Sequence, residues 1–372
     1  MTTAAVTETT AAPQVEVKTL KVSVDMNDVF VLLLLPELPA FKIEKPLELE
    51  ICGRSMLDWS VLAIGKLPYE TVAVKKTDDI MTVVRGRGDK FKYTVVLYAD
   101  TPLITEQTLE QAVAFVRSYN HHVGRMPRGW VFENEYIKSA ETISPEDIPN
   151  LSLEDFIIAY NYGQLASIET IARRRINLKA ISDGVRIMDL NTAYIDAPVV
   201  IERGVSIEPN VMIKGTSVIK SGVRILSGSR IMSSEVGEGT TVGPYAYLRE
   251  GNKVGKGCRI GNFVELKNSC IGDKTKVSHL TYVGDAVIGD KCNIGCGVVF
   301  CNYNGKVKSK TVVGNNVFVG SNCNLVAPLT LEDDAYLAAG STITKDVPKH
   351  ALAIARTQQT IKENYWNVEN KE

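Results

Sequence analysis

Residues 195–231 read IDAPVV-IERGVS-IEPNVM-IKGTSV-IKSGVR-ILSGSR-I, with an isoleucine at every sixth position. An α-helix repeats every 3.6 residues and a strand alternates every two, so neither has this period. A hexapeptide period predicts short straight segments joined by equivalent corners, with one apolar side chain per segment pointing inward. This pattern is typical of a parallel β-helix, whose turns stack on one another.

The period continues to residue 343 with valine, leucine, isoleucine and phenylalanine at the inward positions. Many of these residues precede a glycine, which accepts the backbone angles that a corner requires. Three hexads make a turn of about 18 residues, and we predict roughly eight turns stacked about 4.8 Å apart. Between Phe300 and Val313 the spacing widens to thirteen residues. The polar, basic segment Cys301–Lys310 should therefore leave the coil as a loop, a natural carrier of binding residues.

Composition excludes several classes of protein. The 372 residues have a formal net charge of −1, so no global field points to nucleic acid or to an anionic membrane. The longest apolar run, Val29–Leu35, is too short for a membrane span and predicts a buried strand. Seven cysteines without a CxxC pair indicate a cytoplasmic protein with reduced thiols. The spacing of Cys292, Cys296 and Cys301 also allows a metal cluster, but zinc sites show tighter pairs, so buried thiols are favoured.

The rest of the chain divides into segments of different character. Residues 1–18 predict a disordered tail, 19–185 an α/β domain around a mostly parallel sheet, 190–345 the β-helix and 346–372 a charged C-terminal arm. In the α/β domain, Val29–Leu35 and Tyr93–Tyr98 predict buried strands. Thr105 predicts the cap of a helix that runs to about Tyr119, and a second helix is expected from about Leu151 into the 170s.

Several longer stretches resemble a known family. Residues 260–311 read IGNFVELKNSCIGDKTKVSHLTYVGDAVIGDKCNIGCGVVFCNYNGKVKSKT, and GPYAYLR (243–249), VFVGSNCNLVAP (317–328) and AGSTITKDVPKHALAIAR (339–356) extend the match. Together they closely resemble the acetyltransferase domain of the bifunctional N-acetylglucosamine-1-phosphate uridyltransferase / glucosamine-1-phosphate N-acetyltransferase family. The resemblance covers about residues 190–366. It implies a left-handed β-helix that works as a homotrimer, with active sites between subunits.

The same resemblance implies acetyl transfer from acetyl-CoA, as co-substrate, to the amine of glucosamine 1-phosphate, in the pathway to UDP-N-acetylglucosamine. The sugar amine must lose a proton before it attacks the thioester, and a neutral imidazole suits that task. His279, in SHLTY, stands where the family has its catalytic base. The acceptor phosphate calls for cationic side chains. The substrate-binding positions fall on Arg249, Lys267, Tyr282, Asn293 and Lys308, and the acetyl-CoA positions on Cys296, Asn302, Tyr303, Ser321, Ala339 and Arg356.

Two of these motifs differ from the family pattern at one residue each. Several of the predicted site residues can also be explained without a function. Cys296 stands where the family commonly has alanine, and Asn304 where it has aspartate. Lys267 and Lys308 are also compatible with ordinary solvated charges, and Arg249 with a surface ion pair. Their occurrence together at the family's spacing favours the functional interpretation.

The N-terminal segment differs from the family pattern more than the β-helix segment does. The family's nucleotidyltransferase domain has a loop of the form LAAGxGTRM after its first strand, whose backbone amides cradle a triphosphate. Here LPELPAFK (35–42) follows that strand, without glycine or arginine and with two prolines. KPLELEICGRSMLDW (45–59) and ADTPLIT (99–105) still resemble family motifs, which puts Asp100 on a magnesium position. The second magnesium position falls on Tyr160, beside Asn161.

We therefore expect a truncated, degenerate nucleotidyltransferase-like domain without uridylyl transfer, and Mg²⁺ only if that domain is active. Two alternatives stay open at this point. One is the full bifunctional enzyme that also uses UTP. The other is a non-catalytic trimeric scaffold.

Overall fold

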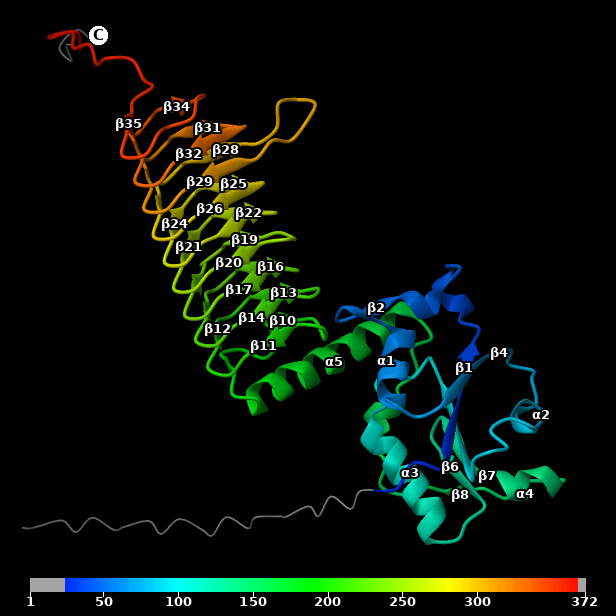
Figure 1. Ribbon diagram of the computed structural model, residues 1–372. Helices are drawn as coiled ribbons and strands as arrows, with labels where there is room; N and C mark the ends of the chain where they lie inside the picture. Colours follow the sequence, from blue (N-terminus) through cyan, green and yellow to red (C-terminus); the bar gives the residue numbers. More distant parts are fainter. Residues whose placement is uncertain (1–23, 367–372) are drawn as a thin grey trace, which may run out of the picture. The chain divides into compact units, whose positions relative to one another are not determined.

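The structure is a computed structural model that describes residues 24–366. The tail predicted for residues 1–18 and the end of the predicted C-terminal arm, residues 367–372, lie outside the described residues. The chain forms two compact units (Figure 1). The first holds the residues up to Glu37 together with Ser60–Phe156, and the second holds Leu38–Trp59 together with Ile157 onward. The domain bounds expected from the sequence stay predictions.

The first unit is built on a six-stranded sheet with the order β4-β1-β5-β7-β6-β8. β1 pairs in parallel with β4 and β5, and β6 with β8, whereas β7 runs antiparallel to β5 and β6. The two predicted strands are confirmed: both are largely buried, and β1 is apolar throughout, whereas β5 also contains two tyrosines and a threonine. The strands are β1 (Val29–Pro36), β4 (Tyr69–Val74), β5 (Tyr93–Tyr98), β6 (Val123–Met126), β7 (Gly129–Glu133) and β8 (Glu146–Asp147).

Short helices pack against this sheet. α3 (Glu106–Ser118) begins as predicted at Thr105, whose hydroxyl accepts a hydrogen bond from the Thr108 amide, and it buries Leu109, Ala112, Val113 and Val116. α2 (Ile80–Val84) and α4 (Asn134–Ser139) pack on the sheet residues Leu32, Leu34, Val96 and Phe132. α1 (Met56–Ile64) links the two units in sequence.

The second predicted helix starts later than expected. Residues 153–156 form only a turn of 3-10 helix, and α5 runs over Tyr162–Ser182. The start is set by Asn161, whose side chain accepts a hydrogen bond from the Gln164 amide as an N-cap. The Asn177 side chain of α5 is fully buried and donates to the carbonyls of Leu190 and Ala193, which ties the helix to the first coil of the β-helix.

A small hairpin also belongs to the second unit. β2 (Glu50–Ile51) and β3 (Arg54–Ser55) are antiparallel, and the Cys52 carbonyl between them accepts a hydrogen bond from the Ala197 amide of the first coil. Two 3-10 turns, Pro39–Phe41 and Pro46–Glu48, precede it. The hairpin and α5 thus both contact the N-terminal end of the coil, which otherwise would be an open sheet edge.

The coil has three parallel faces, which we call face A, face B and face C in the order in which the chain crosses them from β10 onward. Face A contains β10 (Tyr194–Ile195), β13 (Met212–Lys214), β16 (Arg230–Met232), β19 (Tyr247–Leu248), β22 (Glu265–Lys267), β25 (Tyr282–Gly284), β28 (Val299–Cys301), β31 (Asn324–Val326) and β34 (Thr342–Ile343). Face B contains β11 (Val200–Ile201), β14 (Val218–Ile219), β17 (Glu235–Val236), β20 (Lys253–Val254), β23 (Cys270–Ile271), β26 (Ala286–Ile288), β29 (Thr311–Val313) and β32 (Leu329–Leu331). Face C contains β9 (Arg186–Ile187), β12 (Ser206–Ile207), β15 (Arg224–Ile225), β18 (Thr241–Val242), β21 (Arg259–Asn262), β24 (Lys276–His279), β27 (Asn293–Ile294), β30 (Phe318–Val319), β33 (Tyr336–Leu337) and β35 (Leu352–Ala353).

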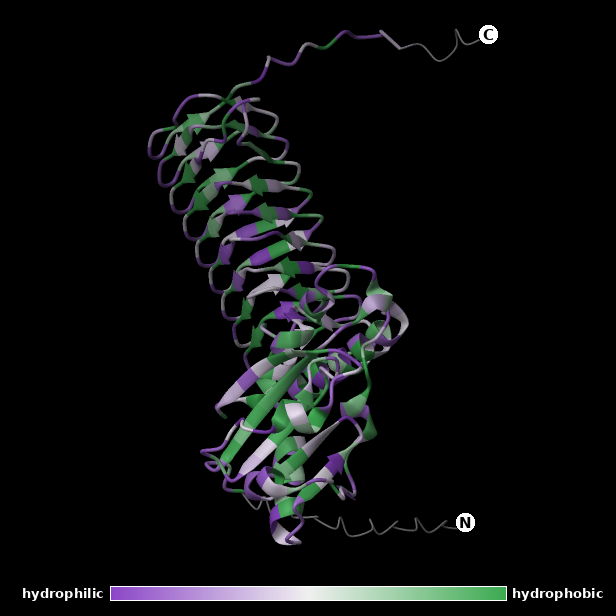
Figure 2. Cartoon of the chain, turned by 90° about the vertical axis from the view of Figure 1, so that its right-hand side faces the viewer, coloured by the Kyte–Doolittle hydropathy of each residue, from purple (hydrophilic) through white to green (hydrophobic). Residues whose placement is uncertain are grey.

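The coils stack in register, inward residue on inward residue. Ile260, Val277 and Ile294 are direct partners in neighbouring strands, and Val319 and Leu337 continue the same row. All five are almost completely buried in one continuous core of isoleucine, valine and leucine. Hydrophobic and hydrophilic residues accordingly alternate along the coils (Figure 2). Each such burial is worth about 1.5–3 kcal/mol, so the hexad period is itself the main stabilising feature.

The predicted loop is confirmed. Residues 302–310 leave the coil between β28 on face A and β29 on face B, and coil pairing resumes where Thr311 aligns with Ala286. The fold class is the predicted one, an α/β unit with a mostly parallel sheet followed by a left-handed parallel β-helix of hexapeptide repeats. Among residues 24–366, we find no helix that is both long and apolar enough to cross a membrane.

Candidate active site

The predicted site residues gather along two edges of the coil because stacking in register converts sequence spacing into columns. The residue two positions after each inward residue of face C lies at the corner between faces C and A. Successive coils place Asn262, His279, Cys296, Ser321 and Ala339 there, and we call this set the C/A column. The equivalent position after face A gives the A/B column, which consists of Glu250, Asn268, Asp285 and Asn302.

His279 ends β24 and is exposed to solvent. Its Nδ1 lies 2.7 Å from Oδ1 of Asn262, one coil below. An amide oxygen can only accept, so Nδ1 carries the hydrogen and the lone pair of Nε2 is left free. The Asn262 contact therefore orients the ring as a proton acceptor toward solvent.

Above His279 the C/A column contains only small side chains. Cys296 is half-buried, and Ser321 and Ala339 are exposed. Arg356 lies beside the same column, because a Cβ placed on Gly340 would be 3.8 Å from its Cδ. Four of the six predicted acetyl-CoA residues thus lie along one track that leads away from His279. Asn302 and Tyr303 instead belong to the other edge of face A.

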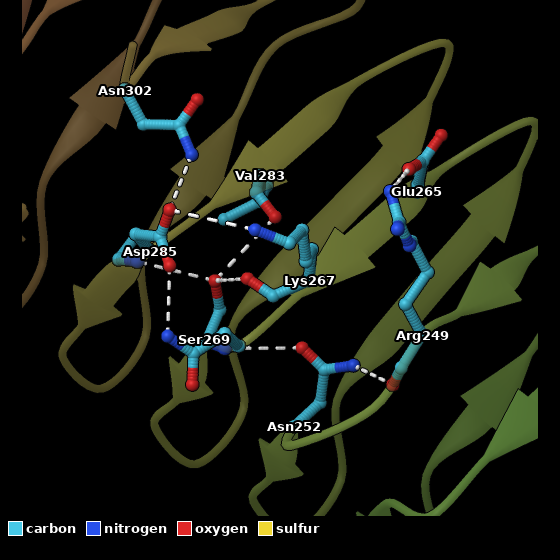
Figure 3. Close-up of polar contacts among 10 residues, drawn as sticks. Arg249, Asn252, Glu265, Lys267, Ser269, Val283, Asp285 and Asn302 are labelled. Carbon is cyan, nitrogen blue, oxygen red and sulfur yellow. Dashed lines mark hydrogen bonds and ion pairs between the residues drawn. The ribbon is translucent and has the colours of Figure 1, made fainter. Parts of the chain in front are cut away.

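The A/B edge carries the predicted cations (Figure 3). Lys267 Nζ lies 3.8 Å from Oδ2 of Asp285, and Arg249 Nη1 donates to Oε1 of Glu265 at 3.2 Å. Lys267 lowers the pKa of Lys308, because the amine form accepts a hydrogen bond from the Lys267 ammonium and the two positive charges repel. Lys308, from the loop, and Lys267, from the coil, therefore converge.

Tyr282 joins this cluster, whereas Asn293 does not. The Tyr282 hydroxyl lies over Gly284, where a Cβ would collide with it and with the Asn302 amide. Gly284 is therefore required for this approach. Asn293 begins β27 on face C, in register with Lys276 and Phe318, so it lies on the face that carries His279.

The loop is an ordered hairpin. Tyr303 and Lys308 form an antiparallel bridge, and the Ser309 amide donates to the Asn302 carbonyl at 2.8 Å. Asn304 Oδ1 accepts hydrogen bonds from the amides of Lys306 and Val307, both at 2.9 Å. An aspartate oxygen would accept the same bonds, so the departure from the family motif at Asn304 leaves the turn unchanged.

His279 and the cation cluster lie at opposite edges of face A. Strand β25 separates their backbones, and its three residues span about 10 Å. One chain therefore presents its imidazole and its cations at two separate edges, and we call these two groups of residues the half-sites.

In the first unit, Asp100 follows β5 and its side chain is 2% exposed. Both of its oxygens are occupied by Arg128, with Nε–Oδ1 at 3.0 Å and Nη2–Oδ2 at 2.6 Å, and the guanidinium lies 3.9 Å over the Tyr98 ring. Burial raises the pKa of Asp100, against the effect of the two hydrogen bonds. Residues 24–366 contain no group of three His, Cys, Asp or Glu side chains able to hold a metal. Asp100 as placed here does not fit a magnesium ligand, because Arg128 holds both of its carboxylate oxygens.

Four residues that contact predicted site residues were not themselves predicted from the sequence. Asn262, Glu265 and Asp285 each contact a predicted residue, and all three lie in the quoted motifs. Their positions two residues after, or one residue before, an inward residue could have identified them once the hexad register was assigned. Arg128 carried no such signal, since it follows Asp100 by 28 residues and meets it only through the β6–β7 turn.

A family profile described as hexapeptide repeat of succinyl-transferase matches residues 310–345. A protein named bifunctional protein GlmU from Clostridium botulinum (strain 657 / Type Ba4) is 46% identical over 244 residues, which cover 61% of this chain and 53% of that protein. One of the same name from Clostridium tetani (strain Massachusetts / E88) is 49% identical over 218 residues, which cover 54% of this chain and 48% of that protein.

Among solved structures, the UDP-N-acetylglucosamine O-acyltransferase LpxA from Moraxella catarrhalis RH4 matches with 17% identity and a TM-score of 0.31. The match covers 46% of this chain and 69% of that chain. The chain spans about half the length of the curated relatives it matches. Over more than half of its residues, it is thus similar to proteins named bifunctional protein GlmU, and it carries a hexapeptide repeat.

Proposed function

We propose that this protein transfers the acetyl group of acetyl-CoA to the amine of glucosamine 1-phosphate, in the pathway to UDP-N-acetylglucosamine. The observation that carries the proposal is the His279 imidazole, which Asn262 holds with Nε2 free at the base of a track of small residues. The opposite edge of the same face carries a cluster of cations suited to a phosphate. The similarity to the relatives named above supports the same activity.

In this mechanism His279 Nε2 accepts a proton from the substrate nitrogen as that nitrogen attacks the thioester carbonyl. The new C–N bond forms, the C–S bond breaks, and the proton held by His279 passes to the departing CoA thiolate. The Asn262 contact keeps Nδ1–H in place while Nε2 is protonated. General base catalysis of this kind contributes about 10²–10⁴-fold to a rate.

The acceptor phosphate is bound by Lys267, Lys308 and Arg249. Glu265 and Asp285 lie beside Arg249 and Lys267 (Figure 3), and the charge of Glu250 also acts on Arg249. The phosphate is attracted to the three cations, and the Arg249 guanidinium suits bidentate contact with its oxygens. Tyr282 and Asn293 provide polar contacts to the sugar. Cys296, Ser321, Ala339 and Arg356 bind acetyl-CoA, with Asn302 and Tyr303 shaping the acetyl pocket.

The working form in this proposal is a homotrimer. The amine and the phosphate of glucosamine 1-phosphate are on adjacent ring carbons, yet the His279 backbone and the cation cluster are separated by the whole of β25. Two copies that meet along these edges complete one site from the imidazole of one copy and the cations of the next. Three equivalent contacts then close the assembly.

The N-terminal unit, in this proposal, has no uridylyl transfer activity. Support comes from the prolines that replace the glycine-rich loop and from Arg128, which occupies both oxygens of Asp100. The alternative is suggested by the word bifunctional in the relatives' name. Pyrophosphate release from UTP, Mg²⁺ and N-acetylglucosamine 1-phosphate distinguishes the two, and robust turnover would refute loss of activity.

The experiment that tests the acetyl transfer is release of free CoA thiol from acetyl-CoA with glucosamine 1-phosphate as acceptor. We expect turnover by the wild type and by His350→Ala, a matched control in which an exposed histidine is removed. We expect loss of turnover in His279→Ala with assembly unchanged. Silence of the folded wild type with this acceptor and with related amino-sugar phosphates would favour a scaffold instead.

A further inference from the structure

Asp285 occupies the centre of the A/B column and has no assigned role in the reaction. It follows β25 directly and adopts a left-handed backbone, with φ of 50°. Aspartate and asparagine tolerate this conformation better than other side chains. At this corner the carboxylate turns back over the coil, and its side chain is only 15% exposed.

The carboxylate joins three coils (Figure 3). Its Oδ1 accepts a hydrogen bond from Asn268 Nδ2 in the coil below at 2.8 Å, and its Oδ2 accepts one from Asn302 Nδ2 in the coil above at 2.6 Å. Burial alone would raise the pKa of Asp285, but these hydrogen bonds and the charges of Lys267 and Lys308 together lower it below its ordinary value. This direction follows from the two accepted hydrogen bonds and the neighbouring cations.

The two ends of the 302–310 loop both depend on this residue. Asn302, where the loop begins, is held by the Asp285 side chain. Thr311, directly after the loop, donates its amide to the Asp285 carbonyl at 3.4 Å. The Asp285 amide in turn donates to the Lys267 carbonyl at 3.0 Å. One residue therefore sets the position of the loop relative to the coil that carries Lys267.

The loop needs such a contact because it carries Lys308, whose positive charge is repelled by that of Lys267. Lys308 lies beside Lys267, and two ammonium groups at short range oppose each other. The loop's own contacts, the Tyr303–Lys308 bridge and the Asn304 turn, hold its tip but do not connect it to the coil. The Asn302–Asp285 bond at 2.6 Å joins the start of the loop to the coil below, whereas Lys308 meets Lys267 as a like charge and Asp285 as an opposite one.

We propose that Asp285 is a positioning residue that holds the 302–310 loop closed, so that Lys308 and Lys267 converge on the acceptor phosphate. The inference rests on the proposed function for the identity of the acceptor, but the closure of the loop does not. Asp285 acts through Asn302 and Lys308 and does not itself contact the acceptor.

The test compares Asp285→Ala and Asp285→Asn with Asp290→Ala as a matched control. Asp290 also lies at a corner and bridges two coils, with Oδ1 accepting from the Asp273 amide at 2.7 Å, but at the B/C corner away from the loop. Asparagine at 285 keeps both hydrogen bonds if one neighbouring amide turns over, and it removes only the charge. Alanine removes both bonds.

The first readout is the kinetic constants. In Asp285→Ala we expect the KM for glucosamine 1-phosphate to rise about tenfold, since loss of one such hydrogen bond costs about 1–1.5 kcal/mol. The KM for acetyl-CoA should rise less, because Cys296, Ser321, Ala339 and Arg356 are untouched and only Asn302 and Tyr303 are displaced. An equal rise in both KM values would overturn the inference, since it would indicate a general structural defect.

The second readout does not require any activity. The loop contains three trypsin sites, at Lys306, Lys308 and Lys310, and an opened loop is cut faster. We expect tryptic cleavage within 302–311, followed by mass spectrometry, to accelerate about tenfold in Asp285→Ala and to remain at the wild-type rate in Asp285→Asn and Asp290→Ala.

Unchanged cleavage in Asp285→Ala would overturn the proposal. Equal acceleration in Asp285→Asn and Asp285→Ala would also overturn it, because the charge of Asp285 rather than its hydrogen bonds would then hold the loop. If Asp285→Ala does not fold, Asn302→Ala removes the same bond from the other side and must accelerate cleavage. A protein with no acetyl transfer but with this cleavage pattern would refute the acceptor and leave the clamp standing.

Discussion

His279 and Asn262 are partners in adjacent strands of face C, and the Nδ1 of the imidazole lies 2.7 Å from the amide oxygen of Asn262. The pairing arises because β21 and β24 both extend two residues past their inward residues, Ile260 and Val277. The orientation of the proposed base is thus set by a single residue of the neighbouring coil.

Removal of this contact should weaken catalysis without removing the base. We expect Asn262→Ala to lower kcat about tenfold, because the ring loses its orienting partner, and His279→Ala to lower it by about 10²–10⁴-fold. Thiol release under saturating substrates measures both. The double variant should be no slower than His279→Ala, since the two residues act as a unit. Additive losses in the double variant would show that Asn262 acts on something other than His279.

The two half-sites predict complementation between copies. His279→Ala and Lys267→Ala should each be inactive alone, since each lacks one half-site. Unfolded together and refolded at equal ratio, they should recover about a quarter of the wild-type activity, because random mixing places an intact His279 opposite an intact Lys267 in one site in four. Light scattering checks that the mixture is trimeric. No recovery in a mixed trimer would place both half-sites within one copy.

The proximity of Lys308 to Lys267 predicts an alkaline limit for acceptor binding. The pKa of Lys308 is lower than its ordinary value, so Lys308 loses its charge at a lower pH than a free lysine as the pH rises. We expect the KM for glucosamine 1-phosphate to increase on this side, measured from about pH 7 to pH 10. Lys308→Arg should abolish this increase within this range, because a guanidinium stays protonated. The same alkaline limb in Lys308→Arg would exclude Lys308 as its origin.

The Asp100–Arg128 pair predicts a stability defect in the N-terminal unit. Arg128→Met leaves a buried carboxylate without a partner, and we expect a loss of about 2–4 kcal/mol in free energy of unfolding at pH 7. Burial raises the pKa of Asp100 and the arginine opposes this, so the variant should raise it further. A raised folded-state pKa favours folding at acidic pH and loses that contribution as the pH rises through it. The defect should therefore shrink toward acidic pH.

Asp100→Asn in the Arg128→Met background is the control for this prediction. The amide carries no charge, so the double variant should recover most of the lost stability at pH 7, measured by denaturant unfolding. Isothermal titration of the wild type with Mg²⁺ should show no binding through Asp100. Stability in Arg128→Met that is independent of pH would mean that the pair contributes nothing to folding.

Asn304 stands at the loop tip where the family has aspartate, and we expect exchange of the two residues to leave the kinetic constants almost unchanged. Asn304→Asp should leave both kinetic constants within about twofold, because a carboxylate oxygen accepts the same bonds from the amides of Lys306 and Val307. Asn304→Ala removes both acceptors and should raise the KM for the acceptor several-fold. Equal effects of the two substitutions on that KM would mean that the turn bonds do not position the loop.

The sequence alone predicted the coil and the loop, and its register predicted which site residues share an edge of the coil. A hexad with Ile195 or Val277 at its inward position needs no distant partner to be recognised, because the same local pattern is repeated in every turn and burial of each inward residue stabilises it. The cap of α3 at Thr105 is equally local. The start of α5 was predicted too early, because Asn161 ends an irregular stretch that has no periodicity to mark it.

Only the tertiary structure decided how these residues combine. Stacking in register placed His279 over Asn262 and clamped the loop to Asp285, and it put the imidazole and the cations on opposite edges of face A. The contact between Asp100 and Arg128 depends on a sheet that reverses direction at β7, which no local pattern encodes. Periodic burial is a property of neighbouring residues in the chain, whereas these side-chain contacts depend on which segments the folded backbone brings together.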